Sequence, residues 1–212
     1  DTMKKEFLAN SFTALAENER WNLQAGGHYF VTRNDSSIIA FSIPSNGFDG
    51  IRIMASHSDS PSFKIKENPE IEVEKQYIKL NVERYGGMIL APWFDRPLSV
   101  AGRVIIKNPA TGKLESRLVN VDRDLVMIPN LAIHMNREAN NGYKYNAQKD
   151  MLPLYGMSTA KGTFMQTIAQ AADISADDIL GHDLFLYNRE QASIWGASEE
   201  FVSAPQLDDL QC

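Results

Sequence analysis

Residues 51–61 read Ile-Arg-Ile-Met-Ala-Ser-His-Ser-Asp-Ser-Pro. The apolar residues at the start predict a short buried strand over residues 51–55. His57 comes just past the end of this strand, and Asp59 follows two residues later. An imidazole can bind a metal ion while a nearby carboxylate accepts a hydrogen bond from the other ring nitrogen. The stretch therefore indicates half of a metal-ligand pair or, as the simpler alternative, a loop histidine at a strand end.

The residues before this stretch predict the opening of an α/β unit. Apolar residues at helical spacing favour a helix over residues 3–19. Strands are predicted over residues 28–33 and 37–43, with a turn at Asn34-Asp35 between them.

The middle of the chain has a different pattern, in which short strands alternate with turns from residue 70 to about residue 126. Strands are expected over residues 77–82, 100–107 and 113–119. Helical spacing returns over residues 158–172. Ser175 is expected to cap an acidic helix start, and residues 183–187 to form a strand. These patterns predict an α/β protein that contains a β-rich inserted domain.

Composition narrows the class of protein. The net charge is −6 without clustered lysine and arginine, which argues against binding to nucleic acid or to an anionic membrane. No apolar run reaches the length of a membrane span. Cys212 is the only cysteine, so a disulfide framework is excluded and a reducing, cytoplasmic location is expected.

Several common catalytic motifs are missing from these 212 residues. There is no His-Glu-x-x-His zinc helix, no Gly-x-Ser-x-Gly elbow and no glycine-rich phosphate loop. Serines at positions 56, 58 and 60 surround His57, but a serine nucleophile would also need a base and an oxyanion hole that the sequence does not place.

Eight separated motifs occur in one order along the chain: Tyr29–Asn34, Ile38–Phe41, Ala55–Pro61, Tyr85–Gly87, Trp93–Arg96, Leu98–Arg103, Ile128–His134 and Ala204–Asp208. In these motifs the chain resembles the family of aspartyl aminopeptidase and vacuolar aminopeptidase I, which are dinuclear metallo-aminopeptidases. The resemblance extends from about Trp21 to Leu210.

The resemblance implies a role for four residues. His57 matches a histidine that binds one metal ion, and Asp59 matches the carboxylate that orients it. Asp208 matches the aspartate that bridges two divalent ions, for which zinc is expected and cobalt or manganese are alternatives. His134 matches a histidine that reaches into the active site of a neighbouring subunit; the alternative is an ordinary histidine at the end of an apolar strand or helix.

The chain departs from the family pattern near its end. Asp209 stands where the family has asparagine, Gln206 often corresponds to arginine, and some members have histidine at Asn130. The family's general-base glutamate and remaining metal ligands lie beyond the bridging aspartate, so the chain is expected to be truncated after that residue. Glu199-Glu200 precedes Asp208 and is expected to be a solvated strand start.

The expected architecture is a split metallopeptidase-type catalytic domain, residues 1–68 and 183–212, around an inserted β-rich domain, residues 69–182, that mediates homo-oligomer assembly. The expected activity is removal of N-terminal residues from peptides, with acidic residues preferred and neutral ones as the alternative. By itself the 212-residue chain is expected to be inactive. A second hypothesis is an incomplete or inactive relative that serves as an assembly module, and a third is a peptidase of a neighbouring family.

Overall fold

The structure is a computed structural model that describes residues 2–34 and 36–208. It has two compact units, and the boundary between them falls between Ser56 and His57. The fold is mixed α/β and is dominated by sheets, as the sequence predicts. Among the described residues, no helix is both long and apolar enough to cross a lipid bilayer.

The first unit has one helix and a three-stranded sheet of order β1-β2-β3, in which β1 runs parallel and β3 antiparallel to β2. Its elements are α1 (Thr2–Ala9), β1 (Thr13–Leu15), β2 (His28–Arg33) and β3 (Ser37–Ser42). The two predicted strands are confirmed, but the helix predicted over residues 3–19 is wrong beyond Ala9. Ser11 adopts a φ of 65°, which ends the helix, and the chain continues as β1.

The strand predicted over residues 51–55 does not form among the described residues. A strand is defined by its pairing, and no described strand pairs with this segment. Its apolar side chains are exposed, including Ile53 at 84% and Met54 at 98%. The prediction of a buried strand here is therefore wrong, because local apolar character cannot supply the neighbouring strand that pairing requires.

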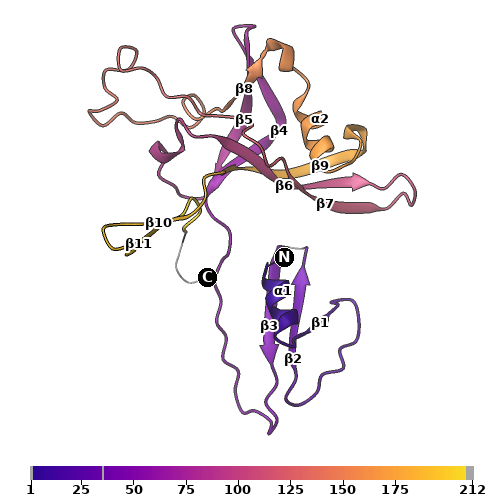
Figure 1. Ribbon diagram of the computed structural model, residues 1–212. Coiled ribbons are helices and arrows are strands. Elements are labelled where there is room, and N and C mark those ends of the chain that lie inside the picture. Colours follow the sequence, from indigo (N-terminus) through magenta and orange to yellow (C-terminus); the bar gives the residue numbers. More distant parts are fainter. Residues whose placement is uncertain (1, 35, 209–212) are drawn as a thin grey trace. The chain divides into compact units, whose positions relative to one another are not determined.

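The second unit contains a six-stranded antiparallel sheet of order β7-β6-β9-β4-β5-β8 (Figure 1). Its strands are β4 (Ser62–Val73), β5 (Tyr77–Tyr85), β6 (Leu98–Lys107), β7 (Leu114–Asn120), β8 (Leu154–Met157) and β9 (Ile179–Asn188). A separate hairpin pairs β10 (Ser193–Trp195) with β11 (Phe201–Ser203). The exposed pair Glu199-Glu200 directly precedes β11, as predicted.

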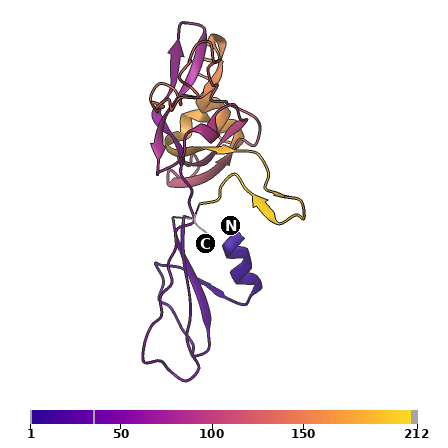
Figure 2. The same ribbon diagram turned by 90° about the vertical axis from the view of Figure 1, so that its left-hand side faces the viewer.

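Helix α2 (Phe164–Ala171) packs on the sheet of the second unit and closes its core (Figure 2). Phe164 and Ile168 are fully buried on this helix and belong to the same hydrophobic core as apolar side chains of β4, β5, β6 and β9. The helix is shorter than the predicted 158–172, because Gly162 adopts a φ of +77° after a separate 3-10 turn, Ser158–Ala160.

The described residues include two further 3-10 turns. Ser175 caps the segment after α2, where its hydroxyl accepts from the amide of Asp177, but the segment Ala176–Asp178 is a 3-10 turn rather than a helix. A third 3-10 turn covers Ala91–Trp93.

The middle of the chain is β-rich as expected. The division into a split catalytic domain and an insert stays a prediction for the complete protein.

A carboxylate on β4 caps the start of α2. Glu70 accepts hydrogen bonds from the amides of Gly162 at 2.6 Å and Phe164 at 2.8 Å, one on each carboxylate oxygen. The preceding residue Thr163 makes no side-chain cap bond of its own. Because the first amides of a helix have no partner within the helix, this carboxylate ties α2 to the sheet from outside.

Replacing Glu70 with alanine is expected to destabilise the chain by about 1–2 kcal/mol, since two helix-terminal donors lose their acceptor. Glu72→Ala is the matched control, because Glu72 forms only an exposed ion pair with Lys161 and should cost less than about 1 kcal/mol. Thermal unfolding of the chain measures both variants. Equal shifts would show that the Glu70 cap adds nothing.

Candidate metal centre

The first residue of the second unit, His57, is hydrogen-bonded to Asp59. The Nδ1 atom of His57 lies 3.2 Å from Oδ1 of Asp59 and 3.0 Å from the Asp59 carbonyl oxygen. Both oxygens only accept hydrogen bonds, so Nδ1 must be the protonated ring nitrogen. The lone pair of the imidazole is then on Nε2, which is the tautomer that a metal-binding histidine needs.

Tyr85, the last residue of β5, holds the other side of the same carboxylate. Its hydroxyl donates to Oδ2 of Asp59 at 2.5 Å. This bond, with a smaller contribution from His57, keeps the pKa of Asp59 below its ordinary value, and the same bond raises the pKa of Tyr85. The carboxylate therefore stays ionised to lower pH. The stabilisation that it contributes is present above the ordinary pKa and is lost as pH falls through the lowered one.

Strand pairing puts these three side chains together. Tyr85 lies opposite Ser62 in the β4–β5 register. Ser62 is three residues after Asp59, so the pairing brings Tyr85 close to the loop. The Ser62 hydroxyl is buried and donates to the Leu186 carbonyl of β9 at 2.5 Å, which fixes the start of β4. Gly86 has a φ of +83°, and a Cβ there would lie 3.2 Å from Pro61. The loop carrying His57 is thus anchored where β5 ends.

Asp208 borders a cavity of about 400 Å³ in the second unit. The same cavity is lined by Ser60 and Pro61, which directly follow Asp59, and by the side chains of Arg96 and Glu190, which form an ion pair. Asp208 therefore faces a cavity next to the loop that carries His57. That His57 and Asp208 share one metal centre stays a prediction.

The described residues do not complete a metal site by themselves. Within residues 2–34 and 36–208, no three histidine, cysteine, aspartate or glutamate side chains gather closely enough to hold a metal ion. The donor chemistry nevertheless fits zinc in part, because it offers an imidazole in the correct tautomer and a carboxylate. Asp209, the departure noted from the family pattern, lies outside the described residues.

His134 lies in an exposed turn, in which the Met135 amide donates to the Ala132 carbonyl. Residues 131–133 are exposed and pair with no described strand, so His134 does not end an apolar strand.

The motif Trp93–Arg96 is a structural corner. Trp93 packs edge-on against Phe63 with ring centroids 5.2 Å apart. The Asp95 carboxylate accepts from the Asn130 amide at 2.9 Å, and Arg96 pairs with Glu190.

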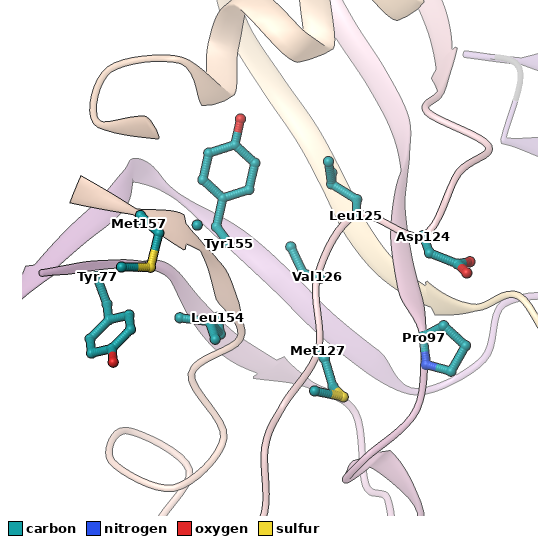
Figure 3. A pocket seen from close by; sticks show the side chains of 10 residues that line it. Tyr77, Pro97, Asp124, Leu125, Val126, Met127, Leu154, Tyr155 and Met157 are labelled. Atoms are coloured by element: carbon teal, nitrogen blue, oxygen red, sulfur yellow. The ribbon is translucent and has the colours of Figure 1, made fainter. Parts of the chain in front are cut away.

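A second cavity, of about 450 Å³, lies beside the edge strand β8 and contains none of the predicted site residues (Figure 3). Its walls are mostly apolar, with Leu154 and Met157 from β8 and Val126 and Met127 from the neighbouring segment. It offers no group of polar side chains suited to binding a metal ion, so we place the candidate chemistry at His57.

Sequence reasoning missed Tyr85 as a member of the site. In the sequence, Tyr85–Gly87 stands out only for its likeness to the family. The β4–β5 pairing, which brings residue 85 next to residue 62, was the missing information.

A histidine held in one tautomer by a carboxylate, in a loop that leads into a strand, is an arrangement found around metal ions in hydrolytic enzymes. Comparison with known proteins gives the family. Residues 1–212 match the model of the aminopeptidase I zinc metalloproteases (M18). The chain belongs to this family.

Individual relatives agree with the assignment. The chain is 46% identical to a probable M18 family aminopeptidase 2 of Clostridium novyi, over 100% of this chain and 50% of that protein. It resembles the structure of Chaetomium thermophilum mApe1 with a TM-score of 0.85 at 33% identity, covering 99% of this chain and 51% of the other. The mApe1 dodecamer of S. cerevisiae shares the fold, with a TM-score of 0.75 at 22% identity over 95% and 47% of the two chains. The chain thus spans about half the length of the relatives it matches.

Proposed function

We propose that the complete protein is a metal-dependent aminopeptidase that hydrolyses N-terminal residues from peptides. The observation that carries the proposal is the oriented histidine: His57 is bonded to Asp59 through Nδ1, within a chain that belongs to a family of zinc metalloproteases. An oriented imidazole has no evident use in an assembly module, so the alternative of an inactive relative is not favoured.

In this proposal the imidazole of His57 and the carboxylate of Asp208 would hold two divalent ions. Zinc is the expected metal, in line with the description of the family. When bound, the ions activate a water molecule for attack on the peptide carbonyl. Asp59 holds the imidazole in its binding tautomer and orientation. The anionic charge of Asp208 offsets the repulsion between the two cations.

The proposed substrates are peptides with acidic N-terminal residues, and neutral residues are the second choice. Both come from the family resemblance alone. The proposed assembly is a homo-oligomer formed through residues 69–182, with His134 reaching a neighbouring active site. Support comes from the exposed position of His134 and from the dodecamer formed by the S. cerevisiae relative. A cytoplasmic location is part of the same proposal.

The test compares the complete protein with the 212-residue chain. Each is loaded with zinc, cobalt or manganese, and bound metal is counted before release from acidic and neutral N-termini is measured. We expect two bound ions and turnover only for the complete protein. Failure of the complete protein to bind metal or cleave any peptide would refute the proposed function.

Asp59→Asn in the complete enzyme is expected to weaken zinc affinity or activity roughly 10–100-fold, because the amide cannot replace the carboxylate charge that strengthens the imidazole as a ligand. Zinc titration measures the affinity. Asp150→Asn is the control, since Asp150 also accepts from a tyrosine, Tyr143, whereas the carboxylate at the His57 ring is that of Asp59. Unchanged activity of Asp59→Asn at limiting zinc would contradict the assigned role.

A further inference from the structure

We infer that Tyr85 is a positioning residue of the metal centre, which acts on His57 through Asp59. This inference rests on the proposed function and extends it to a residue outside the predicted ligand set. Three side chains from two places in the sequence form one continuous chain of hydrogen bonds, from the Tyr85 hydroxyl through both carboxylate oxygens of Asp59 to Nδ1 of His57.

The Asp59 carboxylate needs a hydrogen bond from outside its loop because it is exposed to solvent. The side chains of His57 and Asp59 are 45% and 56% exposed, and both lie in a loop without regular structure. A carboxylate at such a position can exchange its partners for water and change its rotamer. The bond from Tyr85 occupies the second oxygen and leaves the first facing the imidazole. Tyr85 therefore selects the one Asp59 conformation that orients His57.

Tyr85 is suited to this role because the sheet fixes it from two sides. Its backbone is at the end of β5, in register with Ser62 of β4. Its ring packs edge-on against Phe185 of β9, with centroids 5.2 Å apart. Phe185 is in turn covered by the Lys64 ammonium, 5.8 Å from its ring centroid, and Lys64 pairs with Asp183 at 2.7 Å. The hydroxyl is thus presented by three strands of the sheet to a loop residue.

The chain of bonds assigns Tyr85 a specific consequence. Removing its hydroxyl leaves every metal ligand in place but releases the Asp59 carboxylate from its hydrogen bond to the sheet. The zinc-free enzyme then has to order both Asp59 and His57 when metal binds, so zinc affinity falls. Once zinc is saturating, the ligands are ordered by the metal itself and turnover is largely restored. A loss of activity that appears only at low zinc concentration indicates that Tyr85 positions His57. A residue that contacts the substrate would lower activity at saturating zinc as well.

The test uses Tyr85→Phe in the complete enzyme, with Tyr187→Phe as the matched control. Tyr187 is also on the sheet and donates to a side chain, Asn120 at 2.7 Å, that is outside this chain of bonds. We expect Tyr85→Phe to weaken zinc binding roughly 3- to 30-fold in a chelator competition, with kcat near the unmodified value at saturating zinc. Tyr187→Phe is expected to leave zinc affinity unchanged.

A double-mutant cycle with Asp59→Asn tests whether Tyr85 affects zinc binding through Asp59. If Tyr85 acts through Asp59, adding Tyr85→Phe to Asp59→Asn should lower zinc affinity by less than about twofold. Equal zinc affinity for the Tyr85→Phe and Tyr187→Phe variants, or additive effects in the cycle, would overturn the inference while leaving the aminopeptidase proposal intact. An unmodified enzyme without zinc binding or turnover would overturn both.

Discussion

The His57→Ala variant of the complete protein should lose stably bound zinc and at least about 10³-fold in peptide hydrolysis. A metal ion contributes several kcal/mol to the stabilisation of a hydrolytic transition state, and each 1.4 kcal/mol is a tenfold rate. Alanine removes the imidazole, while Asp59 and Tyr85 keep their own hydrogen bond. Metal analysis after dialysis and peptide release measured across added zinc concentrations check both parts of this expectation.

A second histidine provides the control for this variant. His28 is exposed on β2 in the first unit and is bonded through Nδ1 to the Ser42 hydroxyl at 2.6 Å. It resembles His57 in exposure and in having a side-chain partner, but its partner is a hydroxyl. His28→Ala should retain metal and activity. Full metal content in the His57→Ala protein would remove His57 from the set of ligands.

The Gly102→Ala variant should be destabilised by at least about 3 kcal/mol. Gly102 is in β6 with a φ of +154°, opposite Leu184 of β9. A Cβ there would lie 2.0 Å from the Asp183 carbonyl oxygen and 3.0 Å from the Leu184 Cα. Both contacts involve backbone, so no side-chain rotation relieves them. Strands β6 and β9 would have to separate, at a position where Leu184 is fully buried.

Gly181→Ala is the matched substitution on the neighbouring strand. Gly181 pairs with Ile105 in the same ladder, but a Cβ there would meet no atom within 4 Å. Alanine at this position should be neutral or slightly stabilising, since glycine in a strand carries an entropic cost of roughly 0.5–1 kcal/mol. Urea unfolding of both variants separates the effect of a close backbone approach from that of glycine replacement in general. Similar midpoints would contradict the predicted clash.

Local sequence patterns were sufficient for most of the strands. The strand predicted over residues 28–33 matches β2 at both ends, and the strands predicted over residues 100–107 and 113–119 match β6 and β7 to within two residues. In these segments the residues that carry the sequence pattern are also the ones that form the strand. The helix start is likewise correct near residue 3, but its end is set by Ser11 and by the pairing of β1 with β2, which is a contact between distant residues.

The candidate site divides in the same way. His57 and Asp59 are two residues apart, so their contact follows from spacing and is present in the structure. Tyr85 is 26 residues beyond Asp59, and only the β4–β5 register brings it to the carboxylate. Asp208 is further still, and its place beside the Ser60–Pro61 cavity could not be derived from periodicity. Residues that act through tertiary contacts therefore cannot be identified from local sequence patterns.

The unpaired segment at residues 51–55 affects the solubility of the chain. Ile51, Ile53 and Met54 are 77%, 84% and 98% exposed, with Arg52 as the sole charge among them. An extended apolar segment without a strand neighbour is a template on which a second copy can add its own strand. The resistance of the isolated chain to aggregation thus depends on whether another strand pairs with residues 51–55. These residues, which lead into His57, are the ones most open to pairing with a second copy.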